Sequence, residues 1–93
     1  MRRIKLSHTF RRDFKRVKAD PSHRDIGSLL EAVTNLLARD TLLPARCVDH
    51  ALTGKWKGYR DCHVKPDIVL IYSKRDLDIL ELVRLGSHSE LGI

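Results

Sequence analysis

The chain has 93 residues, 42% of them hydrophobic and 32% charged, and its formal net charge is +6. These values predict one globular domain over residues 1–93 and exclude a disordered chain. No apolar run approaches the ~20 residues of a membrane-spanning helix, and the basic start lacks the apolar stretch of a signal peptide, so we expect a cytoplasmic protein. Cys47 and Cys62 are too few and too far apart to predict a zinc motif or a disulfide framework.

The chain begins with a predicted strand and a predicted amphipathic helix. Residues 4–6 form the strand, and Ser7 can cap a helix over residues 8–19 because its hydroxyl accepts from a free amide in the first turn. Apolar residues recur at helical spacing on one face of this helix: Phe10, Phe14 and Val17. The opposite face is basic and carries Arg11, Arg12, Lys15 and Lys18.

Positive charge is concentrated at the start of the chain. Residues 1–18 hold eight Lys or Arg residues and one Asp, a balance of +7. The other 75 residues hold ten basic and eleven acidic residues and sum to −1. Such a field favours a polyanion, most simply a nucleic acid, or an acidic protein partner. A solvated helix face is the alternative interpretation.

A second helix is predicted directly after the first. Asp20-Pro21 ends the first helix and can start the next. Apolar residues then recur at helical spacing up to about Arg39: Ile26, Leu29, Leu30, Val33, Leu36 and Leu37. Two amphipathic helices this close in sequence are expected to form a hairpin that lies on a sheet. Pro44 blocks further helix in the crossing segment.

The rest of the chain is predicted to form strands over residues 47–52, 56–64, 68–72 and 79–85. Residues 68–72 are apolar at both odd and even positions, which point to opposite faces of a strand, so we expect them to form a central strand that is covered on both faces. The connections are short turns, which requires antiparallel neighbours. No helix or strand is predicted from Gly86 onward. The predicted fold class is α+β: an N-terminal strand and a two-helix hairpin packed on a mainly antiparallel sheet of four to five strands.

Polar side chains gather around the predicted strand of residues 56–64. Because the pleat has a period of two, one face of this strand carries Tyr59, Asp61, His63 and Lys65. Asp67 lies across the following turn, near enough to His63 for the two side chains to meet. The strand therefore predicts imidazole and carboxylate groups on a common face.

Two further histidines can reach this face from other strands. His50 can approach it from the preceding strand, and His88 can reach it if the last strand runs beside residues 68–72. His8 and His23 lie at polar helix starts, so we expect them to be ordinary surface residues. The predicted cluster is therefore His50, His63, Asp67 and His88.

This cluster has two possible chemical uses. Strong zinc motifs have short fixed spacings, whereas these residues are scattered over a sheet, so we expect no metal cofactor. Proton transfer is the other use, because near neutral pH one imidazole accepts a proton while another, held cationic by a carboxylate, donates one. With Lys and Arg nearby to steady phosphoryl charge, this pattern favours cleavage of RNA, whose own 2′-hydroxyl is the attacking group.

A family resemblance rests on two strings in the second half of the chain. HALTGKWKGYRDCHVKPDIVLIY at residues 50–72 and GSHSEL at residues 86–91 resemble the YafQ branch of the RelE/ParE toxin superfamily. The core string is specific, whereas the N-terminal half matches mostly in pattern, and together they cover almost the whole chain. The resemblance implies a RelE-like fold and a toxin of a type II toxin–antitoxin system. It also implies a ribosome-dependent, metal-independent endoribonuclease.

The same resemblance implies the partners and the site residues. The implied partners are the ribosomal 30S A site with its messenger RNA, a small acidic DNA-binding antitoxin, and operator DNA through the antitoxin complex. His50 and His63 are expected to act on the attacking side and orient the phosphate, Asp67 to hold an imidazole in place, and His88 to protonate the leaving 5′-oxygen. Candidate RNA contacts are Lys57, Arg60 and Lys65, with Arg11, Arg12, Lys15 and Lys18 of the basic helix face.

Two positions depart from the family pattern. Ile68 and Gly92 stand where the family often has aromatic residues, which stack on bases with a gain of roughly 1–3 kcal/mol each. Trp56 and Tyr59 remain as possible stacking groups. Two rival functions stay open: a catalytically inactive nucleic-acid-binding or co-repressor module of the same fold, and a ParE-like gyrase inhibitor, which would lack the histidine–aspartate set.

Overall fold

Five strands form one sheet in a computed structural model that describes residues 1–93. The strands are β1 (Arg3–Leu6), β2 (His50–Ala51), β3 (Arg60–Lys65), β4 (Ile68–Ser73) and β5 (Ile79–Gly86). Their order across the sheet is β1-β5-β4-β3-β2. β1 runs parallel to β5, and every other neighbouring pair is antiparallel. The predicted α+β class and the mainly antiparallel sheet are confirmed.

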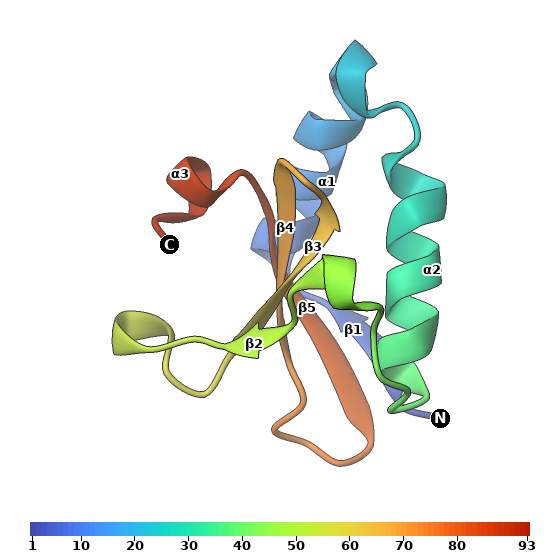
Figure 1. Ribbon diagram of the computed structural model, residues 1–93, viewed down its shortest axis with the longest axis vertical. Coiled ribbons are helices and arrows are strands. Elements are labelled where there is room, and N and C mark those ends of the chain that lie inside the picture. The colour runs from blue at the N-terminus through green and yellow to red at the C-terminus, as the bar shows by residue number, and fades with distance from the viewer.

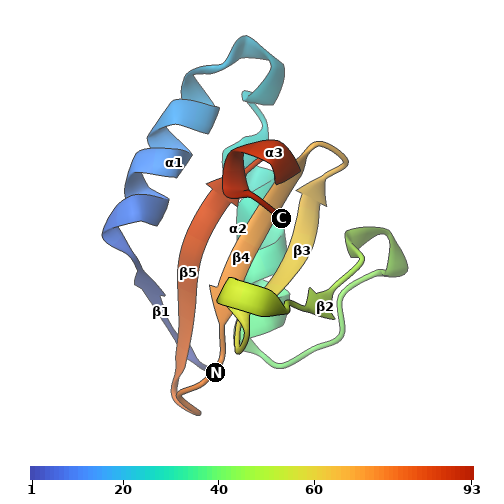
Figure 2. The same ribbon diagram turned by 90° about the vertical axis from the view of Figure 1, so that its left-hand side faces the viewer.

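Two long helices cover one face of this sheet, and a short third helix lies on the other face (Figures 1 and 2). The helices are α1 (His8–Ala19), α2 (Ile26–Ala38) and α3 (His88–Leu91), with 3₁₀ turns η1 (Pro21–His23), η2 (Ala45–Cys47) and η3 (Gly54–Trp56). None of the helices is long and apolar enough to cross a membrane. The two faces of the sheet are therefore unequal, and only one of them is covered by long helices.

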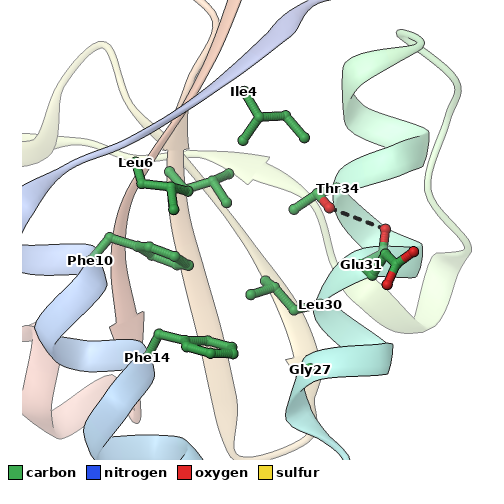
Figure 3. Close-up of a pocket in the computed structure, with 9 residues that line it drawn as sticks. Ile4, Leu6, Phe10, Phe14, Gly27, Leu30, Glu31 and Thr34 are labelled. Carbon is green, nitrogen blue, oxygen red and sulfur yellow. Dashed lines mark hydrogen bonds between the residues drawn. The ribbon is translucent and has the colours of Figure 1, made fainter.

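The capping of α1 explains why this helix begins where the sequence predicts. The Ser7 hydroxyl accepts a hydrogen bond from the Phe10 amide at 2.9 Å, and the helix begins at the next residue, His8. The apolar stripe of α1 then faces inward, and Phe10 and Phe14 point toward Leu30 of α2 (Figure 3). The four basic residues predicted on the other face are all exposed: Arg11, Arg12, Lys15 and Lys18.

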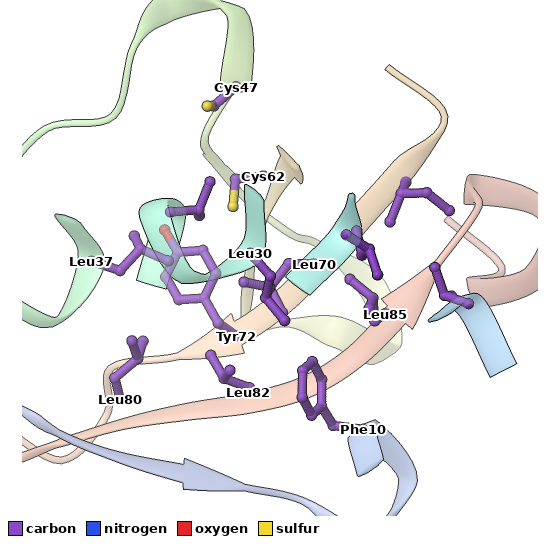
Figure 4. Packing of buried hydrophobic residues seen from close by; sticks show 14 of the residues in the cluster. Phe10, Leu30, Leu37, Cys47, Cys62, Leu70, Tyr72, Leu80, Leu82 and Leu85 are labelled. Carbon is purple, nitrogen blue, oxygen red and sulfur yellow. The ribbon is translucent and has the colours of Figure 1, made fainter. Parts of the chain in front are cut away.

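The main core lies between the helices and the sheet. Every residue of β4 is buried, as expected for a central strand covered on both faces. Leu70 and Tyr72 point from β4 toward Leu37 of α2, and Leu82 and Phe10 continue the same layer (Figure 4). Burying a large apolar side chain contributes roughly 1.5–3 kcal/mol, so this layer is the main source of stability.

The strands predicted at residues 47–52 and 56–64 are shorter than expected. Only His50–Ala51 pairs in the first segment, and the second strand begins at Arg60 because the chain turns before it. Gly54 and Gly58 have φ of +64° and +94°, a region that favours glycine and interrupts an extended strand. The prediction for residues 56–59 is therefore wrong.

The C-terminal segment is helical, contrary to the prediction of no element there. Ser87 accepts a hydrogen bond from the Glu90 amide, and the Glu90 carboxylate accepts one from the Ser87 amide, which is a capping box that starts α3. Leu91 is buried against Val69 and Ile71 of β4. The cap and this apolar contact fix the segment that carries His88.

Candidate active site

The histidines predicted to act together lie on the sheet face opposite α1 and α2. Residues directly opposite each other in neighbouring strands point to the same face, and Asp61 pairs with Ile71 while His63 pairs with Val69. Val69 and Ile71 form the apolar floor of this face, and α3 lies on the same side (Figure 2). The site therefore consists of polar side chains that lie beside an apolar surface formed by β4 and α3.

His50 of β2 is held beside Asp61 of β3 by strand pairing. The two residues are directly opposite in the antiparallel register, and His50 Nδ1 lies 3.0 Å from Asp61 Oδ1. The same nitrogen lies 2.8 Å from the carbonyl oxygen of Val48. Because a carbonyl can only accept, Nδ1 carries the proton, and Nε2 of neutral His50 keeps its lone pair. His50 is therefore arranged to accept a proton through Nε2.

The residue whose carbonyl contacts His50, Val48, has a strained backbone. Val48 has φ +48° and ψ +48°, the left-handed conformation, which a β-branched residue rarely adopts.

Replacing Val48 with Asn, which tolerates this conformation, should stabilise the protein by about 1 kcal/mol and preserve cleavage activity. The Val48 side chain is exposed, so little packing is lost. The urea midpoint of unfolding measures the change, and a lower midpoint would show that the strain is absent.

His63 and His88 form the second half of the cluster. Their ring centroids are 4.9 Å apart, with an angle of 52° between the rings. His63 comes from β3, and His88 is the first residue of α3, which the capping box and the buried Leu91 hold on the sheet. β5 lies beside β4, which brings His88 to the end of the sheet predicted for it. The structure thus brings His63 and His88 into contact.

Asp61 is the buried carboxylate of the site. Asp61 is 1% exposed, and its Oδ1 has no hydrogen-bond partner beyond the 3.0 Å contact with His50. Burial raises the pKa of Asp61, and positive charge on His50, His88 and His63 would lower it. Asp61 is therefore a buried acid in direct contact with His50, on the sheet face that also carries His63.

The sequence reasoning named Asp67 as the partner carboxylate, and the structure directs that side chain elsewhere. Asp67 lies in the turn after β3 with its side chain 67% exposed, and its Oδ2 is 3.6 Å from His23 Nε2. No ion pair joins Asp67 to His63. His23 itself is buried, so the expectation that it is an ordinary surface residue is wrong.

Asp61 could have been found from the sequence as the carboxylate of the cluster. It lies two residues before His63, on the same face of the strand, and a tight pairing of the two strands places it opposite His50. The missing information was the strand register, which the turn after Ala51 determines.

The predicted RNA-binding residues on β3 have internal partners. Lys65 donates to the Ser22 carbonyl and to Asp25, each at 2.9 Å, and so ties β3 to the connection between α1 and α2. Arg60 donates to Asp49 at 3.4 Å and to the Tyr72 hydroxyl at 3.3 Å. Both side chains therefore stabilise the fold on the helix side of the sheet. The prediction that Lys65 shares a face with His63 is wrong, because the strand pairing shifts register between these two residues.

The loop before β3 combines exposed basic groups with aromatic rings. Lys57 is exposed, and its carbonyl accepts a hydrogen bond from Arg75 at 3.2 Å. The Arg75 guanidinium lies 4.3 Å from the centroid of the Tyr59 ring, and Trp56 contacts Tyr59 edge-on at 5.4 Å. Trp56 and Tyr59 thus pack on each other and on the apolar surface formed by Val69 and Ile71.

No group of three or more His, Cys, Asp or Glu side chains has a geometry suited to a metal ion.

Comparison with known proteins gives a consistent set of matches. Residues 2–92 match the family model described as the bacterial toxin of a type II toxin–antitoxin system, YafQ. The mRNA interferase toxin YafQ of Escherichia coli K12 is 41% identical over 90 residues, which cover 97% of this chain and 95% of that protein.

Solved structures of YafQ proteins have the same fold. The crystal structure of YafQ from E. coli BL21(DE3) has a TM-score of 0.83 and 40% identity, and the match covers 98% of each chain. The toxin in the E. coli DinJ–YafQ complex has a TM-score of 0.79 and 38% identity, again over 98% of each chain. The similarity therefore extends over the whole fold, including every strand that carries a site residue.

Proposed function

The chain belongs to the YafQ family of toxins from bacterial type II toxin–antitoxin systems, which makes it an endoribonuclease of the mRNA interferase class, and we propose that it cleaves messenger RNA in the ribosomal A site. The observation that carries the chemical part of this proposal is the arrangement of His50, His63 and His88 around the buried Asp61. Such a cluster moves protons between oxygen atoms at neutral pH. The substrate supplies the nucleophile.

The proposed reaction is an internal transfer at one phosphodiester. Nε2 of His50 accepts the proton of the 2′-hydroxyl, and the 2′-oxygen bonds to phosphorus while the bond from phosphorus to the 5′-oxygen breaks. His88 donates a proton to that leaving oxygen, and His63 beside it donates a hydrogen bond to the phosphoryl oxygens. The products are a 2′,3′-cyclic phosphate and a 5′-hydroxyl end. Asp61 stabilises the imidazolium that forms at each stage.

Asp67 lies at the edge of the proposed site, and its proposed role is to hold an imidazole in place. Its exposed carboxylate lies in the turn that follows β3, and β3 carries Asp61 and His63.

The RNA-binding role proposed for the basic face of α1 rests on exposure and charge: Arg11, Arg12, Lys15 and Lys18 are all exposed. Ribosomal RNA, with one phosphate per nucleotide, is a suitable partner for such a face. Lys57, also exposed, is a further candidate for RNA contact in the loop before β3.

The proposed protein partner is a cognate antitoxin. The related toxin from E. coli forms a toxin–antitoxin complex with DinJ. Because this chain belongs to the same family, we expect it to bind an antitoxin of its own, a small acidic DNA-binding protein that brings the complex to operator DNA. The net charge of +6 on this chain suits an acidic partner.

Single alanine replacements of the three histidines test the proposal. Changing His50, His63 or His88 to Ala should each slow cleavage by roughly 10²–10⁴-fold, because each removes one proton carrier or phosphate contact. Primer extension on messenger RNA incubated with purified ribosomes measures the rate and locates the cut relative to the codons. His8→Ala is the matched control, since His8 is exposed at the start of α1 and should leave the rate unchanged.

Two results would contradict the proposal. Full activity in all three variants would remove the histidine cluster from the chemistry. Cleavage of free RNA at the same rate as ribosome-bound RNA would remove the ribosome from the reaction.

A further inference from the structure

α3 carries the proposed proton donor, His88, but this helix is too short to be stable by itself. It has four residues, and its only buried side chain is that of Leu91. A helix of this length does not form in isolation. Figure 2 shows α3 on the face of the sheet near the end of β5, with α1 beside the same strand. The position of His88 therefore depends on the contacts that hold α3 from outside.

Arg16 of α1 reaches both sides of His88 with one guanidinium group. Its Nη2 donates a hydrogen bond at 3.1 Å to the carbonyl oxygen of Leu85, which precedes His88 at the end of β5. Its Nε lies 3.3 Å from Oε2 of Glu90, which follows His88 in α3. The third nitrogen, Nη1, donates to Asp13 of the same helix at 2.8 Å. A planar group with fixed donor directions thus joins α1, the end of β5 and α3.

Glu90 connects this guanidinium to the start of α3. Its Oε1 accepts a hydrogen bond from the Ser87 amide at 2.9 Å, while its Oε2 faces Arg16. Hydrogen bonds from Ser87, assisted by the charge of Arg16, lower the pKa of Glu90 in spite of its partial burial. The carboxylate is therefore ionised at neutral pH. Because this one carboxylate both caps α3 and pairs with Arg16, the ion pair acts directly on the turn that contains His88.

The backbone between β5 and α3 packs against the same ion pair. A Cβ atom on Gly86 would lie 3.0 Å from Nη2 of Arg16 and 3.1 Å from Oε1 of Glu90, which is closer than ordinary van der Waals contact. Glycine at this position allows the two charged groups to lie directly over the chain that leads to His88. A shift of the ion pair is therefore expected to shift this backbone as well.

We propose that Arg16 is a positioning residue for the cleavage reaction. Through Glu90 and the Leu85 carbonyl, it fixes the place of α3 on the sheet. The His88 ring then stays against the ring of His63, with 4.9 Å between the two centroids. A displacement of about 1 Å in a reacting group can slow an enzyme by roughly 10²-fold. This inference rests on the proposed function, because it needs His88 as the proton donor.

The geometry disfavours a direct contact between Arg16 and RNA. Its three guanidinium nitrogens each face an oxygen atom of the protein, in Asp13, Leu85 and Glu90. An RNA phosphate would have to displace one of these oxygens. Two of the three belong to carboxylates, which repel a phosphate. Arg16 therefore acts within the protein, unlike the exposed cations of α1 that are proposed to contact RNA.

Arg16→Gln and Glu90→Gln test the proposal, alone and combined. Gln at position 90 keeps an oxygen for the Ser87 amide but has no charge, so the cap remains while the ion pair is lost. Each single variant should lower the maximal rate of cleavage of ribosome-bound messenger RNA by roughly 10-fold to 100-fold. The toxin concentration that gives half of that rate should stay unchanged. The double variant should be no slower than the slower single variant, because both changes remove the same contact.

A matched control and a folding measurement accompany these variants. Arg39→Gln removes the same charge from an exposed position at the end of α2, outside the site, and should keep the maximal rate. Thermal unfolding shows that each variant is folded. Without Arg16, Asp13 keeps its hydrogen bonds from Arg84 and the Leu85 amide, so α1 should stay attached to β5. Additive losses in the double variant, or a loss confined to the half-saturating concentration, would overturn the proposal.

NMR spectroscopy separates this inference from the proposed enzymatic function, because it needs no RNA. The parent should show nuclear Overhauser contacts between the rings of His63 and His88. These contacts should weaken in Arg16→Gln, while those between Leu91 and Val69 persist. Unchanged ring contacts, or weakened ring contacts with an unchanged cleavage rate, would overturn the proposal. Weakened ring contacts in a protein whose His88→Ala variant still cleaves would support the placement by Arg16 and refute only the proposed role of His88.

Discussion

Replacing Asp61 with Asn should slow messenger RNA cleavage by roughly 10²–10⁴-fold and at the same time make the protein more stable. Asn has the shape of Asp but no charge, so positive charge that forms on the histidines during the reaction loses the stabilisation that the nearby Asp61 carboxylate provides. The two expected changes have opposite signs because the same buried charge serves catalysis and opposes folding.

The stability gain follows from the direction of the pKa shift of Asp61. Burial raises the pKa of this carboxyl in the folded protein, so the folded state resists ionising it. The native state therefore binds the proton more tightly than the unfolded state, and the cost is fully present at pH values above the raised pKa. It shrinks as the pH falls through that pKa and is gone below about pH 3.9, the ordinary value for Asp.

Paired measurements on the parent and Asp61→Asn test both parts. Urea unfolding at pH 7 should show a higher midpoint for the variant, and the difference should shrink as the pH falls toward 4. Cleavage should be measured on the same preparations with ribosome-bound messenger RNA. Asp78→Asn is the control, because Asp78 is exposed and its side chain makes no ion pair. A variant that is less stable at pH 7 would show that Asp61 acts as a structural anion.

The sequence predicted those elements whose local signals agree with their tertiary surroundings. Ser7 and the apolar stripe behind it predicted α1 with both ends correct. Continuous apolar residues predicted β4 as the central strand, and short turns predicted the antiparallel order. Each of these signals is local, and the packing of the core reinforces it.

The elements that sequence reasoning missed depend on contacts distant in the chain. α3 has only four residues, too few to form in isolation, and it exists because of its cap and because Leu91 packs on β4. The segment before Arg60 has the aromatic residues of a strand, but Gly54 and Gly58 adopt positive φ and turn the chain instead. Composition alone gives the wrong answer at both places.

The candidate site shows the same division. Strand order and parity predicted that the three histidines lie on one face of the sheet, where His50 contacts Asp61 and His63 contacts His88; their catalytic role stays a prediction. Choosing between Asp61 and Asp67 required the register of the short β2 strand, which places Asp61 directly opposite His50. Closeness in sequence favoured Asp67, which follows His63 across a turn, whereas the carboxylate that contacts His50 is Asp61, which lies opposite it in the neighbouring strand.

Replacing Asp13 with Asn should destabilise the protein by roughly 1–3 kcal/mol, because it removes a buried, hydrogen-bonded carboxylate, whereas its two arginine partners still reach solvent. Asp13 is 2% exposed although it lies on the basic helix α1. Its carboxylate accepts hydrogen bonds from Arg84 at 2.7 Å, Arg16 at 2.8 Å and the Leu85 amide at 3.0 Å. The network fastens α1 to β5 just before the residues that lead to His88.

The pH dependence of this contribution has the opposite sign to that of Asp61. Burial alone would raise the pKa of Asp13, but hydrogen bonds from Arg84, Arg16 and the Leu85 amide outweigh it and lower the pKa. The stabilisation is therefore fully present above about pH 3.9 and is lost as the pH falls through the lower folded pKa. The difference in stability between the parent and Asp13→Asn should accordingly stay constant from pH 7 to pH 5 and shrink in stronger acid.

Asp40→Asn is the matched control for Asp13→Asn, because it separates burial from the number of cations. Asp40 also contacts two cations, Arg2 at 2.9 Å and Lys74 at 2.8 Å, but its side chain is 55% exposed. Water already solvates that carboxylate, so its loss should lower the unfolding temperature much less than the loss of Asp13 does. In thermal unfolding of a chain this small, each kcal/mol corresponds to roughly 4–8 °C. Equal losses in the two variants would mean that burial adds nothing to the Asp13 network and that α1 is held to β5 by apolar contacts alone.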